Sequence, residues 1–122
     1  MPGYIQDAAV FAINEGPALE GKVAAPFKRR RLLGQAVIAQ QNAVGLVPSS
    51  GAMYMMLDIR GTGLSGEVFA DKLLDAHHIA VMPGESFGAA AAGHIRIAMT
   101  VEDEAFKRSL QTIVDFAKEL SS

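Results

Sequence analysis

Two short segments of this sequence, residues 53–60 and 94–99, alternate residue by residue between an apolar side and a mixed side. Because successive side chains of a β-strand point to opposite faces, this alternation predicts two strands that each bury one face. The odd-numbered positions form the apolar sides: Met53, Met55, Leu57, Ile59, Ile95, Ile97 and Met99. Such strands need a second layer over their apolar face, and helices elsewhere in the chain can provide it.

Helical periodicity accounts for most of the remaining sequence. Residues 4–13 form a helical pattern that the Gly-Pro pair at 16–17 ends, and a second pattern runs over residues 26–44. Ser65 is expected to cap a third helix, because its side-chain oxygen can accept a hydrogen bond from a free backbone N–H. Three helices therefore precede or separate the predicted strands.

The last helix has the most regular pattern. Thr100 is expected to cap it, with Asp103 three residues later in a capping-box-like arrangement. Its apolar stripe follows helical spacing: Phe106, Leu110, Ile113, Ala117 and Leu120. Upstream of this helix, residues 79–82 are expected to form a short strand and residues 85–93 an irregular loop rich in Gly and Ala.

The elements interleave in the order α-α-β-α-β-β-α, which predicts an α/β (α+β) fold. We expect a small three- to four-stranded sheet with helices packed on one face. The length of 122 residues suits one hydrophobic core of ordinary size. Half the residues are apolar and 20% are charged, which is typical of a globular chain and excludes a disordered one.

Charge and composition exclude several classes of partner. The net charge of −2 argues against a nucleic acid or an acidic membrane, since both select basic surfaces. The absence of cysteine excludes disulfides and thiolate metal sites, and it fits a reducing cytoplasm. The N-terminus does not resemble a signal peptide, and no apolar run approaches the roughly 18 residues of a membrane span. We therefore expect a soluble, cytoplasmic protein.

Arg96 is the first candidate functional residue. It lies on the mixed side of a strand whose other side is apolar, so the core anchors the backbone that positions it. Its planar fork of donors suits bidentate binding of a carboxylate, which a lysine cannot match. An ordinary solvated arginine at a sheet edge is the alternative, and the pattern alone leaves both open.

A second candidate is the loop that follows the predicted strand at 79–82. Gly84, Phe87 and Gly88 place an aromatic ring between two glycines, which lets the backbone approach a ligand closely. A simple connector would have the same spacing.

Other polar groups do not form a catalytic set. The basic cluster at 28–31 is interpreted as a solvated helix face, and the adjacent His77 and His78 point about 100° apart on a helix, so no metal site is expected. The sequence contains no phosphate-binding loop and no nucleophile–base pair. We therefore expect no catalytic residue in this chain, which indicates either part of a larger enzyme or a binding module.

Four segments, in order along the chain, resemble one known family. They are residues 6–13 (QDAAVFAI), 51–54 (GAMY), 81–88 (VMPGESFG) and 93–97 (GHIRI). Each is similar to a segment in the C-terminal part of the class I/II aminotransferases, the fold-type-I enzymes that depend on pyridoxal 5'-phosphate and include the aspartate aminotransferases. Residues 57–64 (LDIRGTGL) resemble the arginine–pyruvate branch of that family.

The resemblance implies specific roles. Arg96 would grip the substrate α-carboxylate, and the loop with Gly84, Phe87 and Gly88 would border the substrate entrance. Residues 1–25 would be an interdomain segment on the large-domain side, and residues 26–122 would be the C-terminal small domain. The parent enzyme would be a homodimer that exchanges an amino group between an amino acid and a 2-oxo acid.

One departure from the family pattern limits what this chain can do. No lysine here has the sequence context of the family's Schiff-base lysine, so the resemblance implies that pyridoxal phosphate is bound by the parent and not by this chain alone. Two alternatives remain open. The parent could be another enzyme of the same fold, a C–S lyase or an acyltransferase, or the chain could be a freestanding amino-acid-binding regulatory module.

Overall fold

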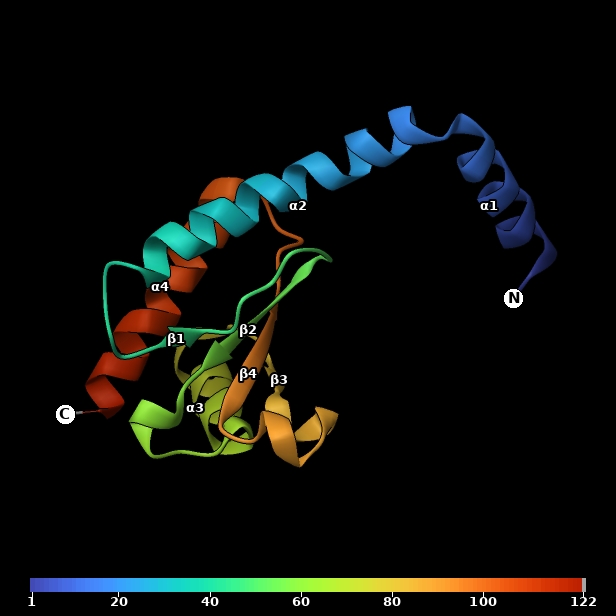
Figure 1. Cartoon of the computed structure of the whole chain (residues 1–122). Helices are drawn as coiled ribbons and strands as arrows, with labels where there is room; N and C mark the ends of the chain where they lie inside the picture. The colour runs from blue at the N-terminus through green and yellow to red at the C-terminus, as the bar shows by residue number, and fades with distance from the viewer. Residues whose placement is uncertain (122) are drawn as a thin grey trace.

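The computed structural model describes residues 1–121, which form an extended N-terminal arm and a compact sheet-and-helix core (Figure 1). The arm consists of helix α1 (Gly3–Glu15) and the first half of helix α2 (Pro17–Ile38). Gly16 joins the two helices with a φ of 60°, a value that suits a residue without a side chain. No residue of α1 is buried, so α1 adds nothing to the core.

The core is built on one antiparallel sheet of four strands in the order β1-β2-β4-β3. The strands are β1 (Gly45–Leu46), β2 (Tyr54–Asp58), β3 (Met82–Pro83) and β4 (His94–Ala98). On β4, Arg96 lies opposite Met56 on one side and Met82 on the other. The expectation of a small sheet of three to four strands is confirmed.

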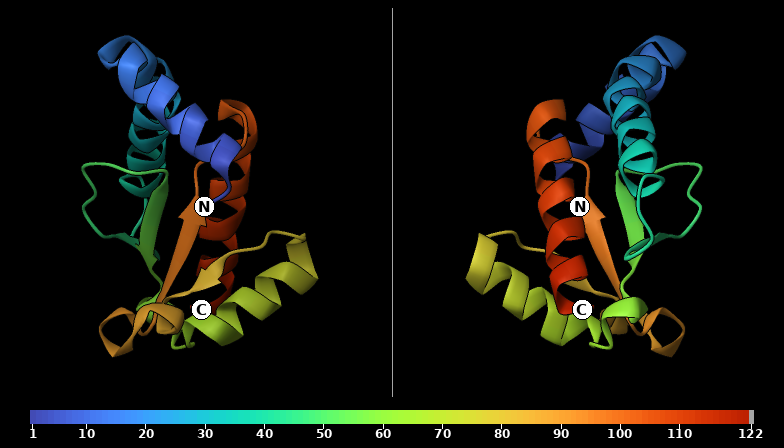
Figure 2. Two further views of the ribbon diagram at one scale, coloured as in Figure 1. Left: turned by 90° about the vertical axis from the view of Figure 1, so that its right-hand side faces the viewer. Right: turned by 90° about the vertical axis from the view of Figure 1, so that its left-hand side faces the viewer.

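The helices α2, α3 (Gly66–His77) and α4 (Asp103–Leu120) cover one face of this sheet. Figure 2 shows α4 running alongside the two central strands. The odd-numbered residues 55–59 and 95–99 are buried against the helices, as the alternation predicted. The prediction is wrong for Met53, which lies before the start of β2 and is 39% exposed. The fully buried side chains with the largest volumes are Phe69, Met55, Leu57, Ile59, Leu73, Ile95, Met99, Leu110, Val44 and Val114.

The two predicted helix caps have different outcomes. Ser65 precedes α3, and its hydroxyl oxygen accepts a hydrogen bond from the backbone N–H of Val68 at 3.2 Å, which confirms that cap. The prediction for Thr100 is wrong, because α4 begins at Asp103, directly after Glu102, and has no side-chain cap. The Asp103 carboxylate is bound by α2 and therefore does not form a capping box.

A cluster of ionic and hydrogen bonds joins α2 to the start of α4. The side chains of Arg29 and Arg30 both donate to the Asp103 carboxylate, Arg30 from Nε at 2.8 Å, and Arg30 Nη1 also donates to the Met99 carbonyl at 3.0 Å. Arg30 is buried. The interpretation of residues 28–31 as a solvated face is therefore wrong for Arg30, because a buried guanidinium is stable only where its donors are paired.

Several predicted boundaries are also wrong. Helix α2 begins at Pro17 and passes through Pro26, whereas the predicted helix began at residue 26. It ends at Ile38 because Gln41 closes a turn: its side-chain nitrogen donates to two carbonyls, and its oxygen accepts the N–H of Ala43 and of Val44. The strand expected at 79–82 is reduced to β3, and the expected loop at 85–93 contains most of two short 3-10 helices, η2 (Gly84–Phe87) and η3 (Ala89–Ala91).

No helix within residues 1–121 combines the length and apolarity needed to cross a membrane.

Candidate functional site

The candidate site lies on the face of the sheet opposite the helices. The even-numbered residues of the two central strands point to this face: Tyr54, Met56, Asp58, His94, Arg96 and Ala98. Each is exposed or partly exposed, while the odd-numbered residues between them are buried. The alternation that builds the core therefore also places Arg96 on an open surface with rigid support beneath it.

Arg96 is held by two aromatic rings. Its guanidinium carbon lies 4.1 Å from the centroid of the Tyr54 ring and 4.5 Å from that of the Phe87 ring. Within residues 1–121, the Arg96 side chain forms no hydrogen bond or ion pair. A planar cation that stacks on rings keeps its N–H donors available at its edge. This arrangement suits an incoming carboxylate.

The structure brings only one of the three predicted loop residues into contact with Arg96. Phe87, at the end of η2, is 46% exposed and supplies the second ring. Gly84 is buried at the start of η2, where a Cβ atom would collide with the Ala91 carbonyl oxygen. Gly88 has a φ of 108°, which favours glycine. Gly84 and Gly88 thus determine the path of the loop that carries Phe87.

Tyr54 and Glu85 were not predicted as site residues. Tyr54 could have been found, because it shares the even-numbered side of the alternation with Arg96. The Glu85 Oε1 atom accepts the backbone N–H of Gly93 at 3.0 Å and of Gly66 at 2.9 Å. Hydrogen bonds from backbone N–H groups, that of Gly93 first, lower the pKa of the Glu85 carboxyl. No sequence pattern indicated these contacts, since Gly93 lies 8 residues and Gly66 19 residues from Glu85 and no regular element links them.

Asp58 and Arg60 form an ion pair at the other end of this face. Arg60 Nη2 lies 2.6 Å from Asp58 Oδ2, and Arg60 Nε and the Arg60 backbone N–H both donate to Asp58 Oδ1 at 3.0 Å. The side-chain hydrogen bonds from Arg60 are the main cause that lowers the pKa of Asp58 to about 2. Asp58 is therefore ionised at neutral pH and is already paired, which leaves Arg96 as the free charge near the centre of the face.

This pair predicts a pH dependence of stability. Because the folded state lowers the pKa of Asp58, its contribution is present above the unfolded pKa near 3.9 and is lost as the pH falls toward 2. We expect Asp58→Asn to reduce the loss of stability between about pH 4 and pH 2, measured by urea unfolding of the chain at a series of pH values. Asp71→Asn, which removes an exposed carboxylate from α3, is the control. Equal pH slopes for the original chain and Asp58→Asn would contradict the prediction.

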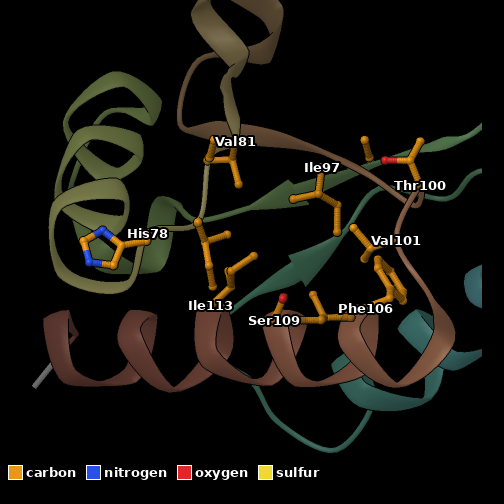
Figure 3. Close-up of a pocket in the computed structure, with 12 residues that line it drawn as sticks. His78, Val81, Ile97, Thr100, Val101, Phe106, Ser109 and Ile113 are labelled. Carbon is orange, nitrogen blue, oxygen red and sulfur yellow. The ribbon is translucent and has the colours of Figure 1, made fainter.

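Two hollows border β4, the strand that carries Arg96, on different sides of the sheet. A shallow one of about 140 Å³ is lined by Tyr54, by Arg96 and Ala98 of β4, and by residues 80–82 at the start of β3 and just before it. A pocket of about 280 Å³ lies on the helix side, where Phe106 and Ile113 of α4 face Ile97 and Val81 (Figure 3). No Asp, Glu, Lys or Arg lines the larger pocket. Among the described residues, His78 is the one ionisable side chain that lines it. The smaller hollow contains the unpaired guanidinium of Arg96, so it is the better candidate for a carboxylate.

The described residues around Arg96 do not form a complete site for pyridoxal phosphate. That cofactor needs a lysine amine within reach of the substrate. All five lysines of the chain are exposed and lie on the helices α2, α3 and α4: Lys22, Lys28, Lys72, Lys107 and Lys118. None of them lines the hollow at Arg96. Within residues 1–121, the hollow at Arg96 thus presents a group that can bind a carboxylate, and no lysine lines it.

Comparison with known proteins gives consistent matches over most of the chain. Residues 1–113 match the family model described as aminotransferase class I and II. The chain is 41% identical to an arginine–pyruvate transaminase of Pseudomonas aeruginosa, over 98% of this chain and 30% of the relative. It is 30% identical to an LL-diaminopimelate aminotransferase of Oleidesulfovibrio alaskensis, over 89% of this chain and 28% of that relative.

The fold also matches that of a solved aminotransferase structure. An aminotransferase from Staphylococcus aureus superimposes with a TM-score of 0.83 at 28% identity, covering 97% of this chain and 31% of that one. The chain thus spans about 30% of the length of the curated relatives named above.

Proposed function

The chain belongs to the family of class I and II aminotransferases, and from this premise we propose that it is the C-terminal small domain of a pyridoxal-phosphate-dependent aminotransferase. The full-length protein transfers an amino group between an amino acid and a 2-oxo acid. Two findings support this proposal: the family match over residues 1–113 and the share of about 30% that the chain has of its relatives' length.

Arg96 binds the α-carboxylate of the substrate in this proposal. The observation that carries it is the unpaired guanidinium stacked on Tyr54 and Phe87. Two parallel N–H groups of the fork can donate to the two carboxylate oxygens, which fixes the orientation of the amino acid as well as its position. The rings on the guanidinium displace water from its faces, so the ionic hydrogen bonds form in a less polar surrounding.

The chemistry at the amino group belongs to the rest of the full-length protein. When bound there, pyridoxal phosphate supplies the electron sink that stabilises a carbanion at the substrate α-carbon. The residues of this chain bind and orient the carboxylate, and closure of this domain over the substrate would exclude water. None of them has to transfer a proton.

The arm belongs to the interface with the remaining protein in this proposal. We assign residues 1–25 to the large-domain side and residues 26–122 to the small domain. The arm exposes a set of large apolar side chains: Tyr4, Ile5, Val10, Phe11, Ile13 and Val23. An apolar surface of this kind is typical of a region that another domain or a second copy of the protein covers.

The proposal predicts activity for the full-length protein and none for this chain alone. We expect the full-length protein, loaded with pyridoxal phosphate, to form alanine from pyruvate with an amino-acid donor. Arginine is the first donor to test, because of the 41% identity to an arginine–pyruvate transaminase. The isolated 122-residue chain should form no alanine, and borohydride reduction with pyridoxal phosphate should label none of its lysines stoichiometrically.

Each part of this experiment has an outcome that would contradict the proposal. A full-length protein that transfers no amino group from any of the common amino acids would contradict the proposed function. A single lysine of the isolated chain that is labelled to completion, with transfer activity, would show that this chain contains the cofactor site.

A further inference from the structure

The loop that carries Phe87 has little regular structure to hold it. Its preceding strand β3 has only two residues, and it pairs with β4 at Arg96 and Ile95. The loop itself continues as η2 and η3, which are short 3-10 helices. Because Phe87 is 46% exposed, packing of its own ring cannot fix the position of the loop. Another contact must hold the ring on Arg96.

Glu85 makes that contact. Its Oε1 atom accepts the N–H of Gly66, the first residue of α3, and the N–H of Gly93, the residue before β4. One carboxylate oxygen therefore ties the loop to a helix of the core and to the strand that carries Arg96. The negative charge also lies at the N-terminal end of α3, where the helix dipole favours it.

The backbone around this carboxylate is packed closely. A Cβ atom at Gly66 would collide with Glu85 Oε2 and with the His94 carbonyl oxygen, and one at Gly84 would collide with the Ala91 carbonyl oxygen. The three segments are thus in direct contact, and the Glu85 side chain fills the space between them. Its second oxygen, Oε2, is buried and has no hydrogen-bond partner within the described residues. Burial of an unpaired oxygen costs free energy, so the two hydrogen bonds at Oε1 and the close packing must hold the side chain in this position.

We propose that Glu85 is a positioning residue for substrate binding, which holds Phe87 on Arg96 by fixing the loop to α3 and to the start of β4. This inference rests on the proposed function, because it assumes that Arg96 binds the α-carboxylate. Glu85 acts through Phe87 and does not touch the substrate. Loss of the Glu85 carboxylate lets the Phe87 ring move off the Arg96 guanidinium. This lowers the affinity for the α-carboxylate and does not change the rate of the chemical step.

The test is a set of variants of the full-length protein, assayed with one amino-acid donor over a range of concentrations. We expect Glu85→Ala to raise KM by about tenfold and to change kcat by less than about twofold. Phe87→Leu should have a similar effect. In the Phe87→Leu background, Glu85→Ala should raise KM by less than about twofold more, because the ring that it positions is already absent.

Conservative and control variants separate positioning from a general loss of structure. Glu85→Gln should restore KM to within about threefold, because its amide oxygen can still accept both N–H groups. Glu67→Ala removes an exposed carboxylate from the first turn of the same helix and should leave KM unchanged. If Glu85→Ala does not fold, Glu85→Asp replaces it, since the shorter acid cannot reach Gly66 and Gly93 together. Glu85→Asp should raise KM in the same way.

The outcomes distinguish the two proposals. If Arg96→Lys raises KM but Glu85→Ala does not, the inference about Glu85 is overturned and the proposed function stands. A full tenfold effect of Glu85→Ala in the Phe87→Leu background would also overturn it, because Glu85 would then not act through the ring. If Arg96→Lys leaves KM and kcat unchanged, the role proposed for Arg96 fails and the inference about Glu85 fails with it.

Discussion

Arg96→Lys in the full-length protein is expected to lower kcat/KM for amino-acid donors by about 10- to 150-fold, which corresponds to about 1.5–3 kcal/mol. Lysine keeps the positive charge but cannot form two parallel hydrogen bonds with a carboxylate. It also lacks the planar group that stacks on Tyr54 and Phe87. Steady-state kinetics with several donors measures the effect, which should be similar for all of them because every donor has the same α-carboxylate.

The matched control is Arg108→Lys on α4. Arg108 is exposed and lies on a helix that packs against the opposite face of the sheet. We expect this substitution to leave the kinetics unchanged. Kinetic constants for Arg96→Lys that equal those of the control across several donors would make Arg96 an ordinary solvated arginine.

The second large effect concerns stability. Phe69→Ala is expected to reduce the free energy of unfolding of the chain by about 3–5 kcal/mol, because it leaves a cavity where α3 packs on the sheet and α4. Phe69 is completely buried, and its ring meets that of Phe116 edge to face, with 5.4 Å between the centroids. Urea unfolding followed by circular dichroism measures the change.

Val68→Ala is the control for this prediction. Val68 precedes Phe69 on the same helix and is 43% exposed, so its truncation should change the free energy of unfolding by less than about 1 kcal/mol. Alanine has a higher helix propensity than either residue, so propensity cannot explain a loss of stability. Equal losses in the two variants would show that the cavity at Phe69 is not the cause. Val68 keeps its backbone N–H in either case, so the cap formed by Ser65 is unaffected.

The helices and strands whose apolar residues recur at a regular spacing were predicted well from the sequence. The two central strands and α4 each repeat their apolar pattern over several residues, and the structure places them as expected. Strand β1 was missed because two residues cannot show an alternation. The start of α2 was placed too late because both Pro17 and Pro26 can begin a helix, and the sequence between them has no clear apolar stripe.

Contacts between distant residues were the other source of error. Asp103 has the spacing of a capping box, but Arg29 and Arg30 of α2 bind its carboxylate. Such a competition depends on the packing of two helices, and nothing in either segment reveals it. The family and its α+β fold were nevertheless predicted correctly, since four short motifs in the right order are specific even when single boundaries are not.

The candidate site was predicted in part for the same reasons. The alternation placed Arg96 on a surface supported by the core, and Tyr54 follows from the same alternation in β2. The contact of Phe87 with Arg96 depends on how the loop folds back over the sheet, which Glu85 controls through two distant backbone groups. Whether Arg96 binds a substrate carboxylate stays a prediction.

Pro26 makes helix α2 easier to bend at one of its turns. Proline has no N–H, so the carbonyl of Lys22 lacks its helical donor and the turn before Pro26 has one bond fewer than its neighbours. Bending of the helix therefore costs the least free energy at this turn. The turn can act as a hinge while the helical segments on either side of it stay straight. If α1 is held by another domain, the sheet with Arg96 would swing about this hinge as one body. The proposed boundary between residues 25 and 26 coincides with the pivot.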